Sequence, residues 1–199
     1  MSGKHVSKNQ PKSFAFSEEN LRIKNEILKK YPDNRKKSAV MPLLNLAQKQ
    51  NDNWISLAAV QYIADFLEVP YIKVYEVATF YTMYNLAPVG KYFVQVCTTT
   101  PCGIRGSGKI VDMCKKYISN KEGELSEDKK SSWIEVECLG ACVNAPMIQI
   151  NDDYFEDLDS DSVEKIFKSF KDDSLPKSGS QRGRKGSEPI KERLTLLKN

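Results

Sequence analysis

The chain has 199 residues, of which 40% are hydrophobic and 28% charged, with a mean hydropathy of -0.50. This composition is typical of one ordinary domain or two small ones, and no segment approaches the roughly 18 apolar residues of a membrane span. The net charge of +4 is concentrated in residues 176–199, which carry seven basic and two acidic side chains. Because the rest of the chain has no basic surplus, we expect no nucleic-acid binding, and we expect the tail to bind a protein partner. The lack of an apolar span predicts no direct membrane insertion.

Residues 1–16 are expected to be a disordered leader. The segment has no apolar core followed by a small-residue cleavage site, so it is not a secretory signal. It also contains the only histidine of the chain, His5. This excludes Rieske-type clusters, histidine-containing zinc sites, and Cys–His or Ser–His–Asp catalysis. Any metal site must therefore use cysteine thiolates.

Residues 17–86 are predicted to form an N-terminal helical domain, a small four-helix bundle. Ser17, Ser38 and Ser56 each precede a segment with helical spacing of apolar residues, and serine is a favoured N-cap. Pro70 is expected to open the last helix.

This last helix, YIKVYEVATFYTMY, is rich in aromatic residues. We expect Tyr75, Phe80, Tyr81 and Tyr84 to be core or packing residues, with contact to a partner as the alternative.

Residues 87–172 read as strand, helix, strand, strand, helix, which predicts an α/β sandwich of thioredoxin-like type. One strand, KYFVQVC, runs into Cys97, and another, WIEVEC, runs into Cys138. A helical crossover joins these two strands, so they should be parallel, with both cysteine loops at their carboxyl ends. Asp161 and Glu164 are expected to form the capping box of the last helix. Residues 173–199 are expected to be a basic, extended C-terminal tail.

Four of the five cysteines form two close pairs, Cys97 with Cys102 and Cys138 with Cys142. Four thiolates hold either a tetrahedral zinc ion or an iron–sulfur cluster. The gaps of four and three residues are wider than the usual C-x2-C knuckle of zinc sites, which favours a [2Fe–2S] cluster. Redox disulfides are a third possibility, although neither pair has the C-x-x-C spacing of disulfide enzymes. Gly140 and its neighbours are small enough for backbone N–H groups to approach the sulfurs.

We assign no function to three further motifs. Cys114 lies inside a predicted helix and is expected to be a buried free thiol. The segment GIRGSGK lacks the Ser or Thr that a phosphate-binding loop needs after its lysine. Asp157, Asp159 and Asp161 alternate as in a calcium loop, but Lys168 occupies the position of the required glutamate.

The chain resembles the NADH-quinone oxidoreductase E-subunit family, the thioredoxin-like [2Fe–2S] ferredoxins of respiratory complex I. The resemblance covers most of residues 17–171 and is strongest in YEVATFYTMYNLAPVGKYFVQVCTTTPC and ECLGACVNAPMIQIND. The tail, SQRGRKGSEPIKERLTLL, also resembles the extended C-terminus of that family.

This resemblance implies that the four paired cysteines ligate one [2Fe–2S] cluster. The cluster would exchange single electrons with an FMN held, like NADH, by a larger partner subunit, against which the helices and the tail would pack beside other peripheral-arm subunits. The chain would be an enzyme component without a substrate site of its own. Its expected location is the cytoplasmic face of a bacterial inner membrane, with the mitochondrial matrix as the alternative.

Several alternatives stay open. The chain could serve an NAD-linked hydrogenase or formate dehydrogenase as the equivalent diaphorase subunit, act as a lone ferredoxin, or be a zinc-stapled interaction module. Under the cluster hypothesis, deletion of residues 176–199 is expected to spare the cluster and weaken association with the flavin subunit.

Overall fold

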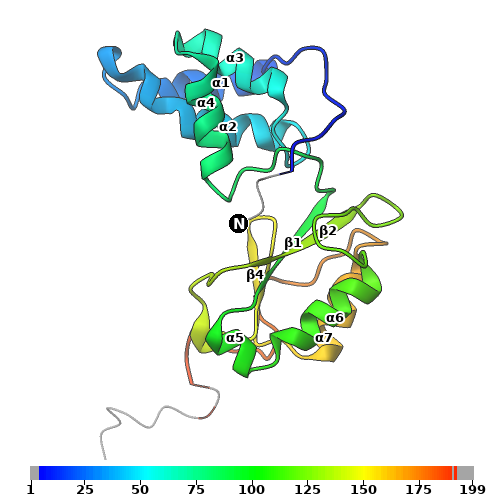
Figure 1. Ribbon diagram of the computed structural model, residues 1–199. Helices are drawn as coiled ribbons and strands as arrows, with labels where there is room; N and C mark the ends of the chain where they lie inside the picture. The colour runs from blue at the N-terminus through cyan, green and yellow to red at the C-terminus, as the bar shows by residue number, and fades with distance from the viewer. Residues whose placement is uncertain (1–4, 190, 192–199) are drawn as a thin grey trace, which may run out of the picture. The chain divides into compact units, whose positions relative to one another are not determined.

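The computed structural model describes residues 5–189 and 191 (Figure 1). The chain divides into two compact units, Met1–Val89 and Gly90–Asn199, and each has its own hydrophobic core. Within the described residues, none of the helices combines the length and the apolar character needed to cross a bilayer.

The first unit is helical. Its segments are α1 (Glu18–Leu28), η1 (Asp33–Ala39), α2 (Val40–Gln50), α3 (Leu57–Leu67) and α4 (Tyr71–Phe80). Ser17 and Ser56 are N-caps as predicted, because their hydroxyls accept hydrogen bonds from the amides of Asn20 and Ala59, each at 3.2 Å. Ser38 is not a cap: it lies inside the 3-10 helix η1, and α2 begins after Ala39 without a side-chain cap. The predicted four-helix bundle is not confirmed, since η1 is a fifth helical segment.

The described part of the expected disordered leader is packed. The ring of Phe16 is buried, and its centroid lies 5.4 Å from that of Tyr62 on α3. The backbone amide of Ser7 donates to the carbonyl of Leu86 at 2.9 Å. Residues 1–4 lie outside the described part of the chain.

The aromatic residues at the end of α4 do not all join the core. Tyr84 is buried, and its hydroxyl donates to the carbonyl of Met41 at 2.9 Å. Tyr75 packs partly against the same core. Phe80 is 79% exposed, so the expectation is wrong for this residue. Tyr81 is 38% exposed and packs its ring edge-on against that of Tyr84, with the centroids 6.4 Å apart. Helix α4 ends at Phe80, and Tyr81 is its C-cap residue with an extended backbone.

The second unit is a mixed sheet with two helices that share one core. Its segments are β1 (Tyr92–Cys97), α5 (Thr100–Ile104), α6 (Ser107–Tyr117), β2 (Ser131–Val136), η2 (Cys142–Asn144), β3 (Ile148–Ile150), β4 (Asp153–Glu156), α7 (Ser160–Ser169) and β5 (Gly179–Ser180). The strand order is β2-β1-β3-β4-β5. β1 and β2 are parallel as predicted, whereas β3 is antiparallel to β1 and to β4.

The core of this unit lies on one face of the sheet. Val94 and Val96 of β1 point to the same face, because residues two apart on a strand share a side, and they pack with Cys114 of α6 and Ile166 of α7. Both helices therefore cover this face, and they lie side by side in Figure 1.

Helix α7 begins differently from the prediction. Asp159, not Asp161, is its N-cap, and Ser162, not Glu164, completes the capping box. The Asp159 carboxylate accepts from the Ser162 amide at 2.9 Å, and the Asp159 amide donates to the Ser162 hydroxyl at 2.9 Å.

The described part of the basic tail adds a strand to the sheet. β5 pairs in parallel with β4, with Gly179 opposite Phe155 and Ser180 opposite Glu156. Residues 190 and 192–199, which include the basic Arg193 and Lys198, lie outside the described residues.

Candidate metal centre

The parallel strands bring the two cysteine loops to one edge of the sheet. Cys97 is the last residue of β1 and lies in register with Val136, the last residue of β2. Cys138 follows two residues later. Cys102 lies in the short helix α5, and Cys142 is the first residue of η2. The sequence prediction did not include α5 or η2, which hold the second cysteine of each pair.

The first pair is buried. Cys97 and Cys102 pack on Ala145 and Met147, which form an apolar floor beneath the site. The side chains of Cys97 and Cys102 hydrogen-bond to each other. Burial by itself raises the pKa of Cys97, but hydrogen bonds from the Thr99 hydroxyl and the Leu139 backbone bring that pKa below its usual value. Burial and the Cys97 sulfur raise the pKa of Cys102 to about 12.

The second pair is exposed. The sulfurs of Cys138 and Cys142 lie 3.4 Å apart, and the amide of Gly140 donates to the Cys138 sulfur at 3.4 Å. This N–H and the Cys142 thiol lower the pKa of Cys138, whereas the same contact with Cys138 raises the pKa of Cys142. Gly140 has a φ of +86°, a left-handed backbone conformation that residues other than glycine rarely adopt.

Contacts between the loops hold the two pairs together. The Thr99 hydroxyl lies 3.4 Å from the Cys97 sulfur and also hydrogen-bonds Cys138. The Leu139 amide reaches back to Cys97, and the Leu139 carbonyl accepts from the hydroxyl of Tyr154 on β4 at 2.8 Å. Tyr154 was not predicted as part of the site, because nothing in its local sequence marks a contact to a loop fifteen residues earlier.

The four thiols lie as two pairs. Among the described residues, no group of three or more His, Cys, Asp or Glu side chains is already arranged to hold a metal ion. The thiols are instead grouped two by two, which suits two metals that each take two thiolates. Thiolate sulfurs, backbone N–H donors and an apolar floor are the surroundings that iron–sulfur sites use.

The other singled-out residues do not join this site. Cys114 is buried in the α6 core, and burial raises the pKa of its thiol, as expected for a free structural cysteine. Asp157 does not belong to a calcium loop, because its carboxylate is occupied by the Arg184 guanidinium and the Ser180 hydroxyl.

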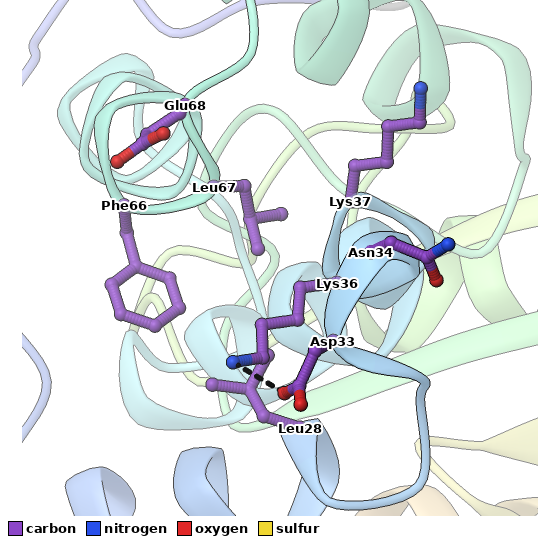
Figure 2. Close-up of a pocket in the computed structure, with 8 residues that line it drawn as sticks. All are labelled: Leu28, Asp33, Asn34, Lys36, Lys37, Phe66, Leu67 and Glu68. Carbon is purple, nitrogen blue, oxygen red and sulfur yellow. Dashed lines mark ion pairs between the residues drawn. The ribbon is translucent and has the colours of Figure 1, made fainter.

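A separate surface pocket lies in the helical unit (Figure 2). It is formed by Leu28, by η1 residues and by the end of α3, and Lys36 pairs with Asp33 at 3.0 Å beside it. Its lining combines the apolar Leu28, Phe66 and Leu67 with polar and charged residues of η1 and with Glu68.

Comparison with known proteins gives consistent matches. The model of the thioredoxin-like [2Fe-2S] ferredoxin family matches residues 24–171. The NADH-quinone oxidoreductase E-subunit of Rickettsia typhi is 53% identical over 161 residues, which cover 81% of this chain and 95% of the relative. The mitochondrial NADH dehydrogenase [ubiquinone] flavoprotein 2 of Dictyostelium discoideum is 48% identical over 189 residues, 95% of this chain and 76% of the relative.

A solved structure resembles the chain in fold alone. The NAD+-reducing [NiFe]-hydrogenase in its air-oxidized state superposes with a TM-score of 0.59 at 15% identity, over 68% of this chain. The match spans 23% of the hydrogenase chain, about a quarter of its length.

Proposed function

The chain belongs to the thioredoxin-like [2Fe-2S] ferredoxin family, and on that premise we propose that Cys97, Cys102, Cys138 and Cys142 hold one [2Fe–2S] cluster. The chain is an iron–sulfur subunit of NADH:quinone oxidoreductase, respiratory complex I, and thus a component of an oxidoreductase. The observation that carries the ligand assignment is the gathering of both thiol pairs at the carboxyl ends of the parallel strands β1 and β2.

The residues around the thiols have distinct roles in this proposal. The Gly140 and Leu139 amides donate to thiolate sulfurs and so stabilise their negative charge. Ala145 and Met147 exclude water from the buried pair. When bound, a [2Fe–2S] cluster supplies one-electron transfer. The exposed pair forms the side of the site that an electron donor can approach.

We propose that the donor is the FMN of a partner subunit that also binds NADH. The exposed edge of the site carries two apolar side chains, Ile104 at 80% exposure and Val143 at 68%. Each follows a ligand cysteine by one or two residues, and exposed apolar residues of this kind indicate a protein interface. The sequence has no dinucleotide-binding fingerprint of its own, which agrees with NADH and FMN on the partner.

The helical unit is proposed to take part in the same assembly, beside other peripheral-arm subunits. Its exposed Phe80 and Met83 at and after the end of α4 offer an apolar surface for such contact. We propose that the complex lies at the cytoplasmic face of a bacterial inner membrane, with the mitochondrial matrix as the alternative. The Rickettsia relatives agree with the first location, and the Dictyostelium relative, which is named as mitochondrial, agrees with the second.

The test is an EPR spectrum of the anaerobically purified, dithionite-reduced protein, with iron and zinc counted on the same sample. The expected result is an S = 1/2 signal of a reduced [2Fe–2S] centre with two irons per chain. A silent sample with one zinc would overturn the proposal in favour of a structural module. If the cluster is present, addition of an active NADH- and FMN-binding partner subunit should allow NADH to reduce it.

A further inference from the structure

The C-terminal tail contacts the loop that carries the second cysteine pair. After β5, the chain turns so that the guanidinium of Arg184 is almost fully enclosed, with its side chain 7% exposed. Its partner Asp157, directly after β4, has a side chain that is 3% exposed. A buried ion pair in a tail otherwise rich in exposed charges requires a structural reason.

Arg184 uses all three of its guanidinium nitrogens. Nε donates to Asp157 Oδ2 at 2.8 Å, and one terminal nitrogen donates to Asp157 Oδ1, which completes a two-bond fork. That same nitrogen also donates to the carbonyl of Val143 at 3.0 Å, and the other terminal nitrogen donates to the carbonyl of Glu188 at 3.0 Å. Val143 lies in η2, directly after the ligand candidate Cys142.

Three more contacts join the tail and β4 to η2. The side-chain amide of Asn144 donates to the carbonyl of Gly186 at 2.9 Å and to the carboxylate of Glu156 at 2.5 Å. The amide of Asp157 donates to the carbonyl of Asn144 at 2.7 Å. The two residues that follow Cys142 are therefore fixed from one side by Arg184, Gly186 and Asp157.

The charges of this pair are fully satisfied. Burial by itself raises the pKa of Asp157, but the bonds from Arg184 and Ser180 outweigh burial and hold that pKa below its usual value. A buried ion pair contributes little net stability over an apolar pair of the same size, yet it fixes one geometry when every bond is made. The planar guanidinium presents its donors in a rigid fork, which makes two parallel bonds to a carboxylate and a further bond to a neighbouring carbonyl; a lysine ammonium lacks this fixed fork. The arrangement is thus suited to positioning a loop.

We propose that Arg184 is a positioning residue for the cluster ligand Cys142: docking of residues 179–188 on Asp157 and Val143 fixes η2 and thereby sets the geometry of the exposed thiol pair. This inference rests on the proposed function. It predicts the opposite of the expectation from sequence that removal of residues 176–199 spares the cluster.

The experiment compares Arg184→Lys and Arg184→Gln with the matched control Arg182→Gln in the full chain. Arg182 has the same charge and is 42% exposed at its side chain, and its guanidinium lies 3.9 Å from the Asp159 carboxylate. The readouts are the EPR spectrum of the reduced protein and the rate of iron loss to an Fe(II) chelator. Because loss of a residue that orients a ligand typically weakens metal binding about 10-fold to 100-fold, we expect both Arg184 variants to lose iron faster by a factor in that range, with altered g-values.

The outcomes separate this inference from the proposed function. If the wild-type protein contained no iron and gave no signal, the proposed function would fail. If the wild type contained the cluster while both Arg184 variants kept its spectrum and its rate of iron loss, the positioning role alone would be wrong. A merely structural role would lower the unfolding temperature of the apo-protein without changing the spectrum. Asp157→Asn provides a second test, since it keeps the shape of the site and leaves the Arg184 charge unpaired.

Discussion

Cys138 and Cys142 are exposed, whereas Cys97 and Cys102 lie on an apolar floor, so the four thiols of the candidate site differ in their surroundings. Cys114 is as buried as the first pair, but it sits among Val94 and Ile110 in the helix-covered core. Burial alone therefore does not mark a ligand. What distinguishes the four is sulfur-to-sulfur contact and the backbone N–H groups directed at them.

Substitution of Cys138 and of Cys114 should have opposite consequences. Cys138→Ser replaces a thiolate by a weak ligand, so we expect loss of the cluster, seen as loss of visible absorbance and of two irons per chain. Cys114→Ser should keep both, with a decrease in stability of roughly 1–3 kcal/mol because a hydroxyl is buried in an apolar core. A colourless Cys114→Ser protein that is still folded would show that the ligand assignment is wrong.

Tyr84 should make the stability of the chain depend on alkaline pH. Burial, followed by the nearby Tyr81, raises the pKa of Tyr84 to about 12. A raised pKa in the folded state contributes stability that is present below the unfolded value near 10 and is lost as the pH rises towards 12. At 1.36 kcal/mol per pKa unit, the loss is about 2–3 kcal/mol.

Tyr84→Phe isolates this contribution. The variant should be about 1 kcal/mol less stable at pH 8, because the hydrogen bond to Met41 is gone. Between pH 10 and 12 its unfolding free energy should fall less than that of the wild type, as measured by urea unfolding. Parallel curves for the two proteins would contradict the assignment to Tyr84.

At the scale of elements, the local sequence pattern correctly predicted the strands before the cysteine loops and two of the helix caps. Alternating apolar residues placed β1 and β2 directly before the cysteine loops, and the crossover rule made them parallel. The caps Ser17 and Ser56 follow from the same local chemistry. Elements shorter than two turns, such as α5 and η2, have too few residues to show a period.

Contacts between residues far apart in the chain could not be predicted from the sequence. Asp157 and Arg184 are 27 positions apart, and each looks like an ordinary surface charge in its own segment. The cap of α7 was misplaced because Ser162 takes the role usually given to Glu or Gln in a capping box. Phe80 was expected in the core as one of the aromatic residues of its segment, but it is the last residue of α4 and is 79% exposed.

The start of β1 depends on one glycine. Gly90 has a φ of +80°, and an added Cβ would lie 2.7 Å from the carbonyl oxygen of Lys130, which accepts from the Tyr92 amide at 2.9 Å where β1 meets β2. Gly90→Ala should therefore destabilise the second unit by about 2 kcal/mol or more. The matched control, Gly108→Ala, has open space at its Cβ in α6 and should be neutral or about 0.5 kcal/mol more stable. Thermal unfolding of both variants decides, and equal transition temperatures would refute the close-approach explanation.

At the scale of the whole molecule, each unit has a separate core and its own exposed apolar side chains. In the helical unit these include Phe80 and Met83, and in the second unit Ile104 and Val143. Apolar residues exposed near a candidate redox site and at a helix end suit an assembly in which one large partner contacts both units.

Two substitutions test whether both units bind the same partner. Phe80→Ser and Ile104→Ser each remove an exposed apolar side chain worth about 1.5–3 kcal/mol if it is fully buried at the interface. Each variant should then bind the flavin- and NADH-binding subunit roughly tenfold to a hundredfold more weakly in a titration. The reduced EPR spectrum should be unchanged, and Ile23→Ser on α1, which also removes an exposed apolar side chain, serves as the control. Since distant sites add in free energy, the double variant should show the product of the two effects. If the double variant binds the partner as tightly as the single variant of lower affinity, only one unit contacts the partner.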